Sequence, residues 1–190
     1  MIFWRAKGIL IASFVFGGLL LSDLGTGAAF GSGSNVTTIS VPDAGVTFQV
    51  PDDYTELSPA EVASVYKVGT PANWTIGDRT RTTKIAYFVT PANTPIEQLD
   101  RAKAVVEKEL RESIPTAEWK RNEKIITQGH PWYCFEFAAS RANASIHKIL
   151  LFTIRRGKFV QLTFWSTRDE FPKVEEVLWR SIRSITVQPN

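Results

Sequence analysis

The chain has 190 residues, a formal net charge of +3 and one cysteine, Cys134. Apolar residues make up 44% of it and aromatic residues 12%, which is typical of a folded domain and excludes a largely disordered chain. The single cysteine excludes an internal disulfide and a cysteine-based zinc or iron–sulfur site within one chain, and the small basic excess does not indicate a nucleic-acid partner.

The first 28 residues look like a separate targeting segment. Arg5 and Lys7 precede an uncharged, mostly apolar stretch over 9–21, which is shorter than the roughly 20 residues that span a bilayer. Basic residues, a short apolar stretch and small residues around Ala28 are typical of a secretory signal. We therefore expect residues 1–28 to be a cleaved signal peptide or, alternatively, an uncleaved N-terminal anchor. Either outcome places the rest of the chain outside the cytoplasm, in the periplasm or cell envelope.

Residues 29–35 are rich in glycine and serine, which predicts a flexible linker, and 36–190 are expected to form a single domain. The start of this domain alternates apolar and polar side chains, which predicts two short strands around a turn at 42–45. Ser58 is the expected N-cap of a first helix, because a proline follows it directly and a glutamate lies three positions later.

The segment 69–82 is polar and contains two glycines and a proline, so we expect a loop. It carries Trp74, Arg79 and Arg81. Tryptophan and arginine are enriched in binding hot spots, and a long loop inside a compact domain is often functional. These three residues are the first candidate binding residues. The alternative is that Trp74 packs back onto the edge of a sheet.

Two amphipathic helices are predicted in the second half of the chain. One covers 95–114 and is expected to be capped by Thr94, and the other covers 171–185; in both, apolar residues recur every three or four positions. A strand is predicted over 84–90, before the first of these helices. Four more strands are expected between the helices, at 119–127, 132–140, 146–155 and 158–166.

Most of these strands follow one another through short connections, which favours antiparallel pairing. Several are apolar on both faces, as in residues 149–152, so both faces of the sheet need a cover. The two predicted long helices are the elements that could bury the two faces. The expected fold is therefore α+β, a three-layer α/β/α sandwich with a central antiparallel sheet.

Few residues are candidates for catalysis or metal binding. Cys134 lies among aromatic residues on a predicted strand, where a free cysteine behaves as a small buried apolar group rather than as a reactive thiolate. His130, His147 and Glu136 remain candidates for a metal site or an active site, but their spacing matches no known ligand or catalytic motif. We expect no catalytic residue, no metal and no cofactor.

A compact group of cations surrounds Gly157, at a predicted tight turn between the last two strands. The group consists of Arg155, Arg156 and Lys158. A solvated turn is one explanation of it. The alternative is that its charge docks on an acidic protein surface or on anionic lipid headgroups, which makes these the second candidate binding residues.

The order of the predicted elements resembles that of the Mog1/PsbP-like superfamily, over about residues 36–190. Three short patterns carry the resemblance: Val50 and Pro51 followed by Tyr54, Gly129 followed by Tyr133, and Ser184 followed by Ile185. None of these patterns is catalytic, and the chain shows no pattern for a metal site of the photosynthetic members. The resemblance therefore implies a non-enzymatic binding or assembly module.

Together, these observations predict an exported, non-catalytic module of the cell envelope that acts through protein–protein contacts. The expected partner is an unidentified envelope or membrane protein; nucleic acid is not expected, and the membrane is contacted only through the N-terminal segment if that segment stays uncleaved. Two alternatives remain open. One is an envelope protein that binds a small ligand, and the other is an envelope enzyme that uses His130, His147 or Glu136.

Overall fold

The computed structural model describes residues 35–66, 70–92, 94–141 and 144–189. The expected signal peptide or anchor, and all but the last residue of the expected linker, lie outside these residues. Within the described part of the chain, no helix is long and apolar enough to cross a bilayer.

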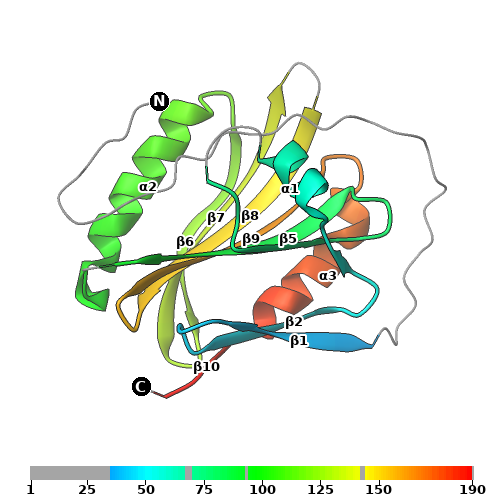
Figure 1. Ribbon diagram of the computed structural model, residues 1–190. Helices are drawn as coiled ribbons and strands as arrows, with labels where there is room; N and C mark the ends of the chain where they lie inside the picture. Colours follow the sequence, from blue (N-terminus) through cyan, green and yellow to red (C-terminus); the bar gives the residue numbers. More distant parts are fainter. Residues whose placement is uncertain (1–34, 67–69, 93, 142–143, 190) are drawn as a thin grey trace.

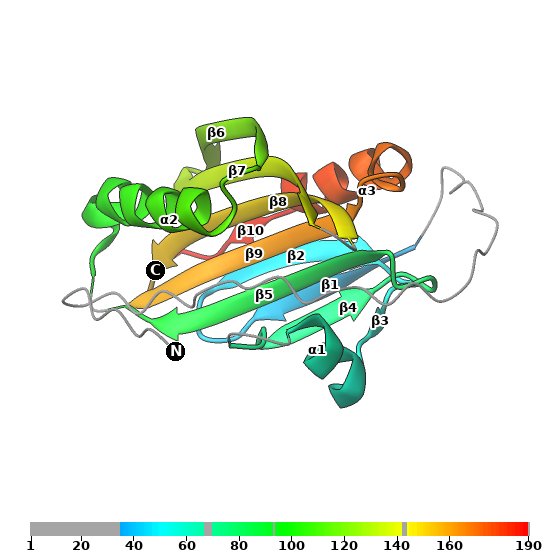
Figure 2. The ribbon, with the colours of Figure 1, turned by 90° about the horizontal axis from the view of Figure 1, so that it is seen from above.

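Seven antiparallel strands form the main sheet, in the order β3-β4-β5-β9-β8-β7-β6 (Figures 1 and 2). Adjacent strands in the chain pair as predicted from β6 to β9, whereas β5 pairs with β9 across the sequence. The strands are β3 (Thr55–Glu56), β4 (Trp74–Gly77), β5 (Thr83–Pro91), β6 (Glu118–Thr127), β7 (His130–Arg141), β8 (Ala144–Arg155) and β9 (Lys158–Thr167).

A second, three-stranded sheet lies against one face of the main sheet. Its strands are β1 (Val36–Val41), β2 (Val46–Pro51) and β10 (Thr186–Val187), with β2 in the centre. The first two strands form the hairpin that alternation predicted, and the inward side chains of β2 are fully buried, as Phe48 shows. β10 is too short to produce a readable pattern and was not predicted.

Three α-helices and one 3₁₀ turn are the remaining elements among the described residues. They are α1 (Pro59–Val65), η1 (Ile96–Gln98), α2 (Leu99–Ser113) and α3 (Phe171–Arg183). The capping box predicted at Ser58 is confirmed: its hydroxyl accepts from the Glu61 amide at 3.3 Å, and its own amide donates to the Glu61 carboxylate at 2.7 Å. The cap predicted at Thr94 is wrong, because a 3₁₀ turn precedes α2 and neither of the two has a side-chain N-cap.

The two faces of the main sheet are buried by different elements. On one face, α2 packs on Phe135, Leu150 and Phe152, while α1 covers Ala86 and Phe88 near the other edge. On the opposite face, β2 and α3 together cover the sheet (Figures 1 and 2). The fold is thus α+β with a large antiparallel sheet, as expected, but the second sheet shares with α3 a layer that was expected to be helical alone.

The loop expected over 69–82 is interrupted by a strand, although residues 70–73 and 78–82 are irregular as expected. Residues 74–77 form β4, which pairs with β5 through the register Trp74–Tyr87 to Gly77–Lys84. Local polarity had suggested a loop. The strand forms because Ile76 is buried in the core and because the edge of β5 offers unpaired backbone groups.

The predicted burial of Cys134 is confirmed, since its side chain has no solvent exposure in the middle of β7. Burial is the main cause that raises the pKa of this thiol to about 12. Cys134→Ala should cost about 1 kcal/mol of unfolding free energy, because it leaves a small void in a packed layer. Urea denaturation would measure the loss. Fast reaction of the native protein with a thiol reagent would contradict the burial.

Candidate functional site

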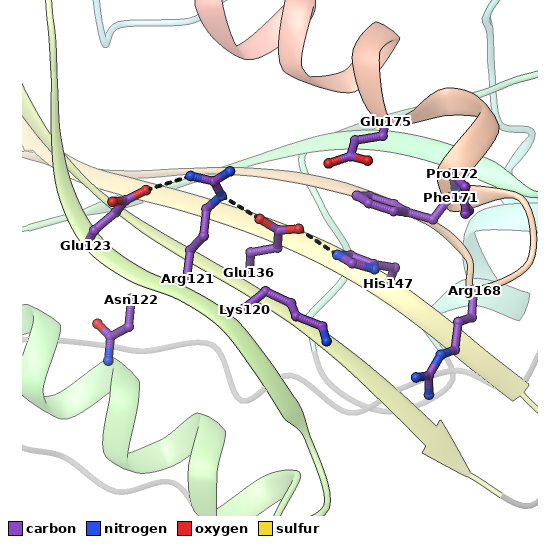
Figure 3. Close-up of a pocket in the computed structure, with 10 residues that line it drawn as sticks. All are labelled: Lys120, Arg121, Asn122, Glu123, Glu136, His147, Arg168, Phe171, Pro172 and Glu175. Atoms are coloured by element: carbon purple, nitrogen blue, oxygen red, sulfur yellow. Dashed lines mark hydrogen bonds and ion pairs between the residues drawn. The ribbon is translucent and has the colours of Figure 1, made fainter.

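A cleft of about 810 Å³ opens between β6, β7 and β8 and the start of α3; we call it the α3 cleft. Its centre holds the side chains of Arg121, Glu136 and His147, one from each strand in order across the sheet (Figure 3). The full lining consists of Lys120, Arg121, Asn122, Glu123, Glu136, His147, Arg168, Phe171, Pro172 and Glu175.

Glu136 is the centre of a polar chain in the α3 cleft. One carboxylate oxygen lies 2.8 Å from His147 Nε2, and the other accepts from Arg121 Nε at 2.8 Å. Arg121 also contacts the exposed carboxylate of Glu123 at 3.2 Å. The Glu136 side chain is only 6% exposed, so both of its oxygens depend on these partners rather than on water.

Aromatic rings of α3 cover this polar chain. The His147 imidazole lies parallel to the Phe171 ring, with 3.4 Å between the centroids, and the Arg121 guanidinium lies 4.8 Å from the ring centre of Trp179. The chain of contacts therefore joins three strands to the first residue of α3 and to Trp179 in its second half. It fixes where α3 lies on the sheet, and with it the width of the cleft.

Two opposing effects set the ionisation of Glu136. Burial raises its pKa, but the hydrogen bonds and positive charges of His147 and Arg121 outweigh burial, so the pKa lies below the ordinary value of 4.5. The carboxylate is therefore charged at neutral pH.

The chemistry available in the α3 cleft is limited. A histidine held by a carboxylate is the arrangement of many general bases. However, the described lining contains no serine, threonine or cysteine to serve as a nucleophile, and the Glu136 carboxylate already holds two partners. The described residues contain no group of three histidine, cysteine, aspartate or glutamate side chains placed to hold a metal ion.

His130 takes no part in this cleft. It lies six positions from Glu136 along β7, which corresponds to about 20 Å. The hydroxyl of Thr153 donates to the Pro131 carbonyl at 2.8 Å, so the same oxygen accepts from His130 Nε2 at 2.9 Å. The structure therefore joins His147 with Glu136 and separates both from His130.

The three candidates from 69–82 do not gather on one surface. Trp74 begins β4; its indole stacks on Tyr87 at 5.5 Å and donates to Glu56 at 2.7 Å. Arg81 folds inward, where it pairs with Glu61 at 2.8 Å. Arg79 is exposed, in the turn between β4 and β5. Their role in binding stays a prediction.

The cations around Gly157 form a structured turn. Arg155 is buried with 7% exposure and donates to the Gln188 carbonyl, and Arg156 donates to the Pro189 carbonyl at 2.9 Å. Lys158 begins β9 and is partly exposed. The turn therefore holds the C-terminal segment beside the main sheet.

Sequence reasoning missed the role of β6 in the α3 cleft. A strand was predicted at 119–127 without a role in a site, but its register places Arg121 opposite Glu136, next to a bulge at 119–121. A cation on one strand and a glutamate on an apolar strand indicate an ion pair only when the pairing register of the two strands is known. The bulge shifts that register, so the sequence does not reveal it.

Trp74→Ala tests the structural role of the indole. The substitution removes the stack on Tyr87, an edge contact with Phe48 and the hydrogen bond to Glu56, so we expect a loss of about 2–4 kcal/mol of unfolding free energy. Thermal and urea denaturation would measure it. Unchanged stability together with weaker capture of a partner would instead assign Trp74 to a contact surface.

Glu136→Gln tests the polar chain through pH. Because the folded pKa of Glu136 lies below 4.5, its contribution to stability is complete above about pH 4.5 and is lost as the pH falls through the folded pKa. The variant should lose about 2 kcal/mol at pH 7, and the difference from wild type should shrink at lower pH. Urea denaturation across pH 3–8 would measure this, with the exposed Glu123→Gln as the control. A pH-independent difference would refute the assignment.

Several solved structures share the fold at low sequence identity. The solution structure of cyanobacterial PsbP (CyanoP) from Synechocystis sp. PCC 6803 aligns with a TM-score of 0.60 at 16% identity, over 87% of this chain and 99% of that one. LpqN of Mycobacterium tuberculosis, described as involved in cell envelope biogenesis, aligns with a TM-score of 0.55 at 14% identity, over 83% and 93% of the two chains. A protein of unknown function from Pseudomonas aeruginosa aligns with a TM-score of 0.50 at 15% identity, over 82% and 99%.

Comparison with curated protein sequences gives no match. The family model for PsbP, in contrast, matches residues 37–187, which is nearly the whole described domain. The match confirms the resemblance to the Mog1/PsbP-like superfamily that element order and three short patterns had indicated. The chain belongs to the PsbP family.

Proposed function

We propose that this protein is an exported, non-catalytic assembly module of the cell envelope, and that it acts by binding an envelope or membrane protein. Family membership supports a module of the PsbP kind. LpqN, which shares the fold, is described as involved in cell envelope biogenesis, and that role of LpqN agrees with the proposal. The basic and apolar start of the chain supports export.

The observation that carries the proposal is the rim of the α3 cleft. Around the covered polar chain, exposed side chains of both signs surround an open concave surface: Lys120 is 51% exposed, Arg168 44% and Glu123 48%. Mixed charges next to aromatic rings suit a protein surface, because they orient a partner and exclude wrong ones. The buried Glu136 and His147 keep the floor of the surface rigid.

A catalytic role has less support from the same surface. His147 is only 12% exposed, and its ring is stacked on Phe171 while Nε2 is bound to Glu136. A general base needs an open nitrogen within reach of a substrate proton. We therefore assign the pair to shaping the contact surface.

Charge reversal at the rim tests the proposal. The double variant Lys120→Glu/Arg168→Glu should reduce partner capture at least about tenfold and leave the melting temperature within a few degrees, since both side chains are about half exposed. A photo-crosslinking residue at Glu175 would trap the partner from solubilised envelope membranes for identification. Binding of the purified partner then measures the loss.

The matched control is Arg101→Glu/Lys108→Glu, which makes the same change of charge at two exposed positions of α2 that do not line the α3 cleft. It should bind the partner as wild type does. If both double variants bind equally well, and crosslinking at position 175 yields no more adduct than at position 108, the α3 cleft is not the contact surface.

A further inference from the structure

A second cleft, of about 530 Å³, lies at the opposite end of the sheet from the α3 cleft. It opens between η1, the start of β7 and the turn from β8 to β9; we call it the arginine cleft. Its lining includes Arg155, Arg156, Ile96, Ile154, His130 and Pro131.

Arg155 is a buried charge for which the described residues of the cleft offer no anionic partner. Its side chain lines the cleft at 7% exposure, and its Nε has no hydrogen-bond acceptor among the described residues. The partner of its Nη2 is the Gln188 carbonyl, which is a neutral acceptor. None of the described lining residues is acidic. Buried arginines are normally paired with a carboxylate or phosphate, so this arrangement is costly as it stands.

Arg156 adds a second positive charge at the rim, in a fixed position. Its backbone has φ of 47°, and its guanidinium lies so close to Gly45 that a Cβ there would approach to 2.6 Å. The hydrogen bond to Pro189 holds the same group from the other side. His130 adds no charge at neutral pH, because burial and the nearby Arg155 lower its pKa.

Most of the remaining lining of the arginine cleft is apolar. Ile96, Ile154 and Pro131 belong to it, and Thr94 is a polar exception. A ligand pocket with an apolar wall and a few convergent polar groups is the usual form of a small-molecule site, and about 530 Å³ lies within the usual range of volumes.

We propose that the arginine cleft binds a small aliphatic carboxylate, whose carboxylate pairs with Arg155 and Arg156 and whose alkyl part lies on Ile96 and Ile154. Two guanidinium groups favour an oxyanion over a neutral or cationic head group, because arginine pairs with carboxylates through parallel hydrogen bonds. The apolar wall favours an organic anion over inorganic phosphate. This inference stands independently of the proposed contact surface at the α3 cleft.

The experiment uses sodium octanoate as the probe, with calorimetry to measure affinity. Octanoate should bind at submillimolar concentration, whereas octanol, octylamine and inorganic phosphate should bind at least about tenfold more weakly. Arg156→Gln should weaken octanoate at least about tenfold, and Ile96→Asn should weaken octanoate but leave phosphate unchanged. Arg155 is deeply buried, so a substitution there could impair folding as well as binding, and Arg156 is the residue to test.

Lys158→Gln is the matched control, because it removes a positive charge from the same turn at a position that does not line the cleft. It should bind octanoate as wild type does. Three results would overturn the proposal: no binding at about 5 mM octanoate, equal binding of octanoate and octanol, or equal losses in Arg156→Gln and Lys158→Gln. Melting temperatures, measured for each variant, identify any loss that is due to unfolding.

Discussion

The rest of the structure depends on the need to cover a sheet that is apolar on both faces. β7, β8 and β9 alternate between two hydrophobic cores, so that Phe135 and Leu150 point to one side while Cys134 and Leu151 point to the other. Neither face tolerates water, and each needs its own cover. Two helices supply one cover, and a helix with a small sheet supplies the other. The placement of α1, α2, α3 and the small sheet follows from this requirement.

The most deeply buried carboxylate beneath α3 lies where hydrogen-bonding partners match it. Glu136 lies on the otherwise apolar face beneath α3. A histidine and an arginine from the neighbouring strands are the hydrogen-bond partners of its carboxylate. An unsatisfied carboxylate at this depth would cost several kcal/mol, so the three residues are useful only together. The group specifies how β6, β7, β8 and α3 fit, in a way that interchangeable apolar contacts cannot.

Sequence reasoning succeeded where local rules and burial agree. The hairpin at 36–51, the capping box at Ser58, the four successive strands and the two faces of β7 all follow from period and turn chemistry. It failed where distant contacts decide. Residues 74–77 have a loop-like sequence, and their place in the sheet depends on contacts such as the stack of Trp74 on Tyr87. At the start of α2, η1 replaces the expected cap because the chain enters the helix through a tighter turn.

The candidate surfaces show the same limit. The compact group of cations around Gly157 was expected to be either a solvated turn or a docking site, and the sequence alone does not reveal that Arg155 is buried against Gln188. The α3 cleft combines residues from three strands and a helix, so its composition depends on the register and on the bulge in β6. Periodicity identifies which face a residue occupies, but it does not identify the neighbours across a sheet.

The small sheet links the two ends of the domain in a way that bears on how the protein is made. β2 is central in that sheet and pairs with β10 through Thr47–Thr186 and Val46–Val187, so residues about 140 positions apart must meet. A chain emerging from the ribosome can form this hairpin early, but the hairpin lacks its third strand until Thr186 and Val187 have been synthesised. Contacts so distant in sequence slow folding, because the intervening loop must close before they form. The small sheet is therefore among the last parts of the domain to be completed.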